Sequence, residues 1–163
     1  MPLHLTDKAD FGVLYDAEVL HQKSLGKQLN FTREQWISSC SHLPSIGFAK
    51  DGMAFGGAVF YEHEIHFALL PQFHGRWGAL IRPMWEWMFS IEDNVRARVE
   101  KENPKCLDFM RRQWPEDGED ETYVYFRLTR AGLNGSRKPR AMPAVQACPA
   151  PPANRASEVE AVA

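Results

Sequence analysis

Apolar and charged residues alternate along residues 95–100, and directly afterwards the apolar residues recur at helical spacing. The alternation predicts a strand with one buried side, and the change of period predicts a helix over residues 104–114. Asn103 stands between them and can cap the helix, because its side-chain oxygen can accept a hydrogen bond from the first turn. Pro104 suits the first helical position. The sequence therefore predicts a strand and a helix joined by a short capped turn.

Periodicity and turn residues predict the other elements in the same way. Pro83 fits poorly inside a helix, so the helix in that region is expected to begin near Arg82. The predicted order is a helix from Asp10 to about Gly26, with Val13, Leu14, Ala17 and Leu20 on its buried side, a helix after a capping box at Thr32, strands at 46–49, 53–61 and 65–70, a helix within 77–89, the strand 95–100, the helix 104–114 and a strand at 123–129. This order predicts the α/β class, with a mixed central sheet flanked by helices.

The composition is that of a one-domain globular protein, with 163 residues of which 44% are apolar. A net charge of −2 argues against nucleic acid as a partner, since phosphate binding normally requires a basic face. No apolar run is long enough to span a membrane, and no secretory signal is visible. Three widely spaced cysteines predict neither a disulfide framework nor a zinc site, and suit a reducing compartment.

The composition changes after Arg130. Residues 131–163 contain no aromatic residue and are rich in Pro and Ala, so they cannot bury enough apolar surface to offset the entropy of ordering. We therefore expect a folded domain at 1–130 and a C-terminal tail at 131–163 that is disordered unless a partner holds it.

The order of elements, the Asn103-Pro104 junction and the run from Phe67 to Ala79 together resemble the GNAT superfamily of N-acetyltransferases. Within it the chain is most similar to the diverged GNAT-like proteins of tailed bacteriophages, which include internal virion proteins. The resemblance implies a GNAT-like acyl-CoA N-acyltransferase fold, acetyl-CoA as co-substrate without a metal, and an amine acceptor that the sequence does not identify.

The resemblance also implies where the coenzyme would bind. A glycine-rich loop before a helix holds its pyrophosphate in this family, through backbone N–H groups and the helix dipole. Here the loop pattern fits either from His74, with Ala79 at the last small position, or from Gln72, with Gly75 in place; in both registers Trp77 stands where a small residue belongs. Asn103 would orient the last helix, and Leu69 or Leu70 N–H would polarise the thioester carbonyl. The implied coenzyme-binding residues are Leu69, Leu70, His74, Gly75, Arg76, Gly78, Ala79 and Asn103.

Glu64 and His66 are the candidate catalytic residues. They lie two apart and share one face of a strand, and an imidazole titrates near neutral pH, so His66 is the first candidate for the base that takes the amine proton. Glu64 could act instead through water. His63 and His66 would face opposite sides, so no metal pair is expected there. Met110 occupies the position of the tyrosine that donates a proton in many family members, and a thioether cannot do so.

Two hypotheses remain open at this point. The first is an acetyl-CoA-dependent N-acetyltransferase in the cytoplasm of a bacterial host. The second is a catalytically inactive virion component that keeps the fold, with other virion proteins bound through the tail; Trp77, Pro83 and Met110 favour it.

Overall fold

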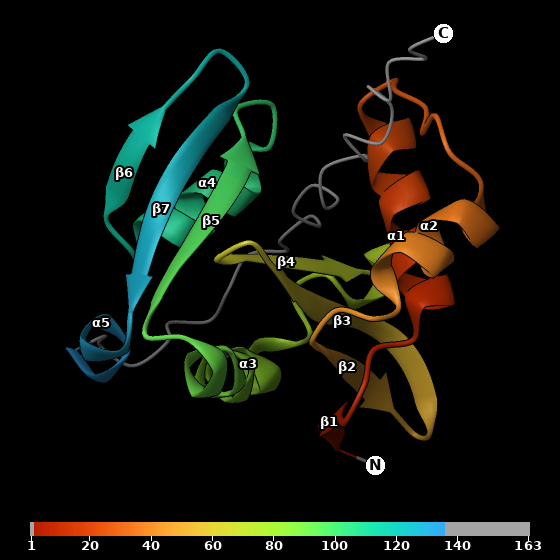
Figure 1. The fold of residues 1–163 in the computed structure, drawn as a ribbon, viewed down its shortest axis with the longest axis horizontal. Coiled ribbons are helices and arrows are strands. Elements are labelled where there is room, and N and C mark those ends of the chain that lie inside the picture. Colours follow the sequence, from red (N-terminus) through yellow and green to blue (C-terminus); the bar gives the residue numbers. More distant parts are fainter. Residues whose placement is uncertain (1, 136–163) are drawn as a thin grey trace, which may run out of the picture.

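The computed structural model describes residues 2–135, which form one seven-stranded sheet with helices on both faces (Figure 1). The strand order is β1-β2-β3-β4-β5-β7-β6, and all neighbours are antiparallel except β4 and β5. The predicted mixed sheet flanked by helices is thus confirmed. The elements are β1 (Leu3–Thr6), α1 (Phe11–Ser24), α2 (Arg33–Cys40), β2 (Ser45–Lys50), β3 (Met53–Tyr61), β4 (Glu64–Leu69), a 3-10 turn (Pro71–Phe73), α3 (Gly78–Ile91), β5 (Asn94–Glu100), α4 (Pro104–Arg111), β6 (Glu116–Glu119), β7 (Tyr123–Thr129) and α5 (Arg130–Gly135).

The predicted caps are present. Asp10 accepts a hydrogen bond from the backbone of Val13, and Thr32 and Gln35 form a reciprocal capping box at α2. Asn103 accepts from the backbone N–H of Cys106, at 3.1 Å. Each of these side chains satisfies a helix N–H that has no acceptor within its helix.

Four short elements were missed, namely β1, the 3-10 turn at Pro71–Phe73, β6 and α5. β1 and β6 are four-residue strands at the two edges of the sheet, and all of β6 is exposed, so neither shows a full apolar alternation. α5 extends the folded part past the predicted boundary at residue 130, because Leu133 is buried in the core. The remainder of the predicted tail, residues 136–163, lies outside the described residues.

The prediction for the start of α3 was wrong. The helix begins at Gly78 and continues through Pro83, although a proline ring removes one backbone hydrogen bond and crowds the preceding turn. Leu80 and Ile81 before the proline, and Met84 and Trp85 after it, are all buried in the core. Their packing on both sides of Pro83 outweighs the local cost, and the N-terminus of α3 therefore stays next to the loop that precedes it.

The sheet separates two apolar layers. One face packs against α3 and α4, and α1 and α2 cover β3 and β4 on the other face (Figure 1). The predicted apolar side of β5 is confirmed, since Val95, Ala97 and Val99 all lie in the larger cluster. The charged side of β5 therefore faces the same way as α1.

The buried side of α1 differs from the prediction at its end. Leu14 and Ala17 are buried as predicted, but Leu20 is 44% exposed. Glu18 and His21 are buried instead, at 1% and 5% exposure. Buried ionisable groups are uncommon unless they have partners, so this end of α1 marks a polar region inside the fold.

Candidate functional site

β4 and β5 run side by side at one end and separate at the other. Glu64 of β4 lies opposite Arg96 of β5, and the backbone N–H of Arg96 donates to the carbonyl of His63 at 2.7 Å. Among residues 2–135, no further pair of residues joins these two strands. Figure 1 shows β5 turning away from β4 beyond this point. The sheet is therefore divided between β4 and β5.

The free edge of β4 carries two peptide groups. The Leu70 N–H donates to the carbonyl of Phe55 on β3 at 2.8 Å, so Leu70 faces β3. Alternate residues of a strand direct their peptide groups to opposite edges, which places those of Phe67 and Leu69 on the β5 side. Of the two expected thioester donors, Leu70 N–H is thus already used, and only Leu69 N–H points to where the strands separate.

The loop after β4 leads into the N-terminus of α3. Gly75 has φ 75°, a left-handed conformation that glycine adopts without steric cost. The backbone N–H groups of His74 and Arg76 are used within the loop, where they donate to the carbonyls of Pro71 and Phe73. Gly78 and Ala79 form the first turn of α3, where N–H groups have no acceptor within the helix. These helix-terminal groups, next to Gly75, are the ones suited to an anion.

His74 connects this loop to β4. Its Nε2–H donates to the carbonyl of Leu69 at 3.1 Å, and the side chain is half-buried. Burial lowers the pKa of His74 below its ordinary value. The imidazole is therefore neutral at physiological pH. It links the loop to β4 through this hydrogen bond and does not offer a positive charge to an anion.

Glu64 and His66 come together on one face of β4, as their spacing predicted. The Nε2 atom of His66 lies 3.6 Å from Oε2 of Glu64, and Nε of Arg98 lies 3.4 Å from the same oxygen. His66 is buried, whereas the Glu64 side chain is 15% exposed. The Glu64 carboxylate thus stands between an imidazole and a guanidinium, at the point where β4 and β5 begin to separate.

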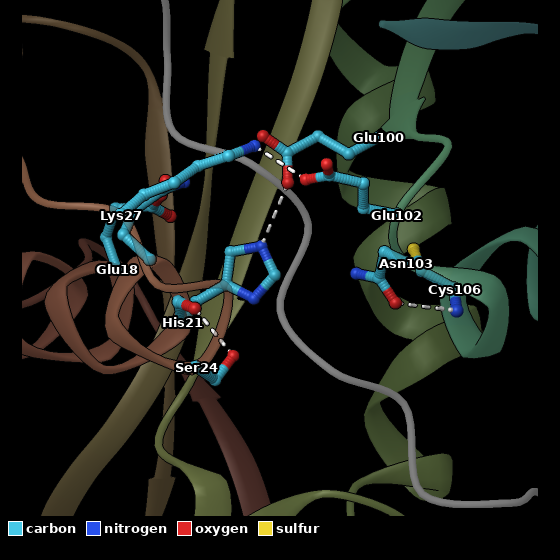
Figure 2. Close-up of polar contacts among 9 residues, drawn as sticks. Glu18, His21, Ser24, Lys27, Glu100, Glu102, Asn103 and Cys106 are labelled. Atoms are coloured by element: carbon cyan, nitrogen blue, oxygen red, sulfur yellow. Dashed lines mark hydrogen bonds and ion pairs between the residues drawn. The ribbon is translucent and has the colours of Figure 1, made fainter.

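A second polar pair, missed by the sequence analysis, crosses from α1 to β5 (Figure 2). His21 Nε2 lies 3.4 Å from Oε2 of Glu100, and both side chains are buried. The hydrogen bond from His21 holds the pKa of the Glu100 carboxyl below its ordinary value, although burial acts in the opposite direction. At the exposed rim, Lys27 donates to Glu102 at 2.7 Å. Alternation placed Glu100 on the charged side of its strand, and no local signal showed that α1 covers it.

Asn103 lies beyond Glu100 and is fully buried at the start of α4 (Figure 2). Its side-chain oxygen is used by the Cys106 N–H, so the residue fixes the direction of α4 at this end of the sheet. Among the described residues, no group of His, Cys, Asp and Glu side chains could hold a metal ion. No helix within residues 2–135 is both long and apolar enough to cross a membrane.

Solved structures of N-acetyltransferases share this arrangement. PaiA N-acetyltransferase from Thermoplasma acidophilum, in complex with coenzyme A, has a TM-score of 0.56 at 12% identity and covers 79% of this chain and 99% of its own. A GNAT-family acetyltransferase from Bacillus anthracis has a TM-score of 0.55 at 13% identity, with coverages of 79% and 95%. N-acetyltransferase PseH from Campylobacter jejuni, in complex with acetyl coenzyme A, has a TM-score of 0.56 at 17% identity and covers 79% of this chain and 99% of its own. This is the GNAT fold.

The likeness is one of structure alone. No protein-family model matches the sequence, and no curated protein matches it either. Trp77 shows how far the sequence departs from the pattern of the GNAT loop. Its indole is 1% exposed, and its ring stacks on Phe48 at 5.6 Å between centroids and contacts Phe67 at 5.5 Å. The side chain points into the core, so the bulky residue at this position of the loop does not fill the loop itself.

Met110 of α4 is fully buried in the same core cluster. It contributes packing, and it cannot supply the proton that a tyrosine gives at this position in many GNAT enzymes. Tyr123 of β7 retains a hydroxyl near this end of the sheet, and burial raises its pKa, so it stays protonated at neutral pH.

Proposed function

We propose that the protein is an acetyl-CoA-dependent N-acetyltransferase that transfers an acetyl group to an amine. One observation carries the proposal: the peptide groups of Phe67 and Leu69 lie on the edge of β4 that β5 leaves, beside the N-terminus of α3. The solved GNAT structures in complex with coenzyme A or acetyl coenzyme A support it, since they share the fold.

Each part of acetyl-CoA has a counterpart in the chain. The amide groups of the pantetheine arm pair with the edge of β4 as an added strand would. The N–H groups of Gly78 and Ala79, next to Gly75, take the pyrophosphate, because unpaired donors and the helix dipole favour an anion there. Leu69 N–H polarises the thioester carbonyl. Leu70, His74, Arg76 and Asn103 act indirectly, by holding β4, the loop and α4 in place.

The Glu64–His66 pair takes the proton of the acceptor amine. The amine nitrogen attacks the thioester carbon, the new C–N bond forms, the C–S bond breaks, and the thiolate leaves without an acid from α4. Glu64 is the more exposed of the two residues, so a bound amine or a bridging water meets its carboxylate first. His66, whose Nε2 lies 3.6 Å from the Glu64 carboxylate, can accept the proton in turn.

Coenzyme binding gives the decisive test. Acetyl-CoA binds only the folded protein, so it should raise the melting temperature, by an amount equivalent to about 2.7 kcal/mol at one hundred times its Kd. Gly78→Glu should abolish this shift. A Cβ at Gly78 meets no atom within 4 Å, so the side chain fits, and it places a negative charge where the pyrophosphate would lie.

Two variants control for charge and size. Gly135→Glu adds the same charge at another open glycine, and Gly78→Gln adds nearly the same bulk without charge. We expect the first to keep the whole shift and the second to keep part of it. Absence of any shift with the unchanged protein at millimolar acetyl-CoA would contradict the proposal. It would leave the alternative of a virion component without catalysis; the buried Met110, which cannot donate a proton, favours only the loss of catalysis.

A further inference from the structure

A row of basic and aromatic side chains covers the open face of β5 and β7. Cross-strand register places Arg96 opposite Arg127 and Arg98 opposite Tyr125, and Glu100 opposite Tyr123. These side chains point away from α4, which packs on the other face (Figure 1). On this face α1 reaches β5 at the end of the strand, where His21 meets Glu100. Arg96 and Arg127, farther along the two strands, are exposed.

The two arginines nearest β4 are held by stacking. The guanidinium of Arg96 lies 4.8 Å from the ring centre of Tyr125, and that of Arg98 lies 5.1 Å from the ring centre of Tyr123. The Tyr125 hydroxyl donates to Asp120 at 2.7 Å, which fixes the ring. Stacking restricts a guanidinium while leaving its N–H groups available, which suits the recognition of a carboxylate or phosphate.

The charges on this face do not cancel at Arg96. Arg98 faces Glu64, and Arg127 is paired with Asp117 at 2.9 Å. Asp120 accepts from the backbone N–H groups of residues 122 and 123, so its charge is partly satisfied by the backbone. Arg96 itself is exposed, and within residues 2–135 it has no carboxylate partner.

The position of Arg96 indicates how its charge acts on an acceptor that binds at Glu64. Arg96 is the residue paired with Glu64 across the β4–β5 junction, and its guanidinium lies over the Tyr125 ring of β7. An amine that meets Glu64 therefore has the Arg96 guanidinium on its β7 side. A second positive charge on the acceptor would be repelled by Arg96, and a negative group a few bonds from the amine would be attracted.

We infer that the acceptor is an amine that carries an anionic group, carboxylate or phosphate, which Arg96 binds while the amine meets Glu64. The inference rests on the proposed acetyl transfer and names the substrate class of the same site. Arg96 selects the acceptor, and the proton still passes to the Glu64–His66 pair.

Matched amines test the inference. The release of coenzyme thiol is measured with β-alanine against propylamine, with O-phosphoethanolamine against ethanolamine, and with putrescine as a dication. At least one anionic amine should exceed its neutral counterpart in kcat/KM by about 10–100-fold, which is the usual strength of a hydrogen bond to a charged group. The anionic amine with the larger ratio of kcat/KM over its neutral counterpart shows whether Arg96 prefers a carboxylate or a phosphate. Added salt should reduce the preference, because Arg96 is exposed.

Variants assign the preference to Arg96. Arg96→Gln should bring the ratio of kcat/KM for the anionic amine to that for its neutral counterpart close to one, and Arg96→Lys should restore part of the ratio. Arg112→Gln removes an exposed arginine at the end of α4, on the other face, and should change neither value.

The outcomes separate the two claims. Coenzyme binding and turnover with neutral amines or putrescine, without preference for an anionic amine, would overturn this inference and leave the acetyltransferase standing. A preference that Arg96→Gln does not reduce would also overturn it. No coenzyme binding and no turnover with any amine would overturn both.

Discussion

The buried His21–Glu100 pair makes the stability of the domain depend on two side chains far apart in sequence. His21→Ala would leave the Glu100 carboxylate buried at 5% exposure without its imidazole donor. Loss of one partner from a buried pair typically costs about 3–5 kcal/mol. A domain of this size has about 7–20 kcal/mol of folding free energy. We therefore expect a substantial drop in the free energy of unfolding at pH 7, measured by urea denaturation.

The double variant His21→Leu with Glu100→Met provides the control. It removes both polar groups and refills the space, so it should be more stable than His21→Ala by at least about 1 kcal/mol. If His21→Ala and the double variant are equally destabilised, the cost comes from lost packing and not from an unpaired carboxylate, and the reasoning would be wrong.

The pH dependence gives a second check on the same pair. The pKa of Glu100 is lowered in the folded state, so the charged carboxylate stabilises the protein above the ordinary glutamate pKa, and this contribution is lost as the pH falls through the folded-state value. Glu100→Gln keeps the size and removes the charge. Its deficit in unfolding free energy relative to the unchanged protein should be full at pH 7 and should shrink below about pH 4. A deficit that is the same at pH 7 and pH 3.5 would refute this.

Two further substitutions test the packing and the cap. Trp77→Ala should lower the free energy of unfolding by about 3–5 kcal/mol, because a fully buried indole leaves a large cavity, while Trp77→Phe should lose clearly less; equal losses in urea denaturation would contradict a packing role. Asn103→Ala should cost about 0.5–2 kcal/mol through loss of the α4 cap, and Asn103→Ser should recover part of it in the same measurement, so a serine variant no better than alanine would argue against capping.

The sequence predicted the elements whose signals are local. Asp10, Thr32 and Asn103 mark helix starts through side-chain hydrogen bonds within a few residues, and these are present. The hairpin between β2 and β3 turns at Asp51 and Gly52, both with positive φ, where the turn residues predicted it. Such features depend only on neighbours in the chain, so they can be inferred without knowing the fold.

The features that the sequence did not predict depend on tertiary contacts. Pro83 argued for a later start of α3, and the core on either side of it decided otherwise. Trp77 could be placed only once Phe48 and Phe67, distant in sequence, were known to meet it. Glu64 and His66 were paired correctly, because strand alternation is local. Their role as base and the binding roles of the loop residues stay predictions.

The single pair that joins β4 to β5 gives the sheet an unusual construction. The strands from β1 to β4 belong to residues 3–69 and those from β5 to β7 belong to residues 94–129, so each part of the sheet comes from one continuous stretch of chain. Glu64 and Arg96 are the only residues at which the backbone ladder of the described sheet passes from one part to the other. A ligand that pairs with the β4 edge would therefore work as a splint, since it would fasten together two parts of a sheet that the chain itself leaves nearly separate.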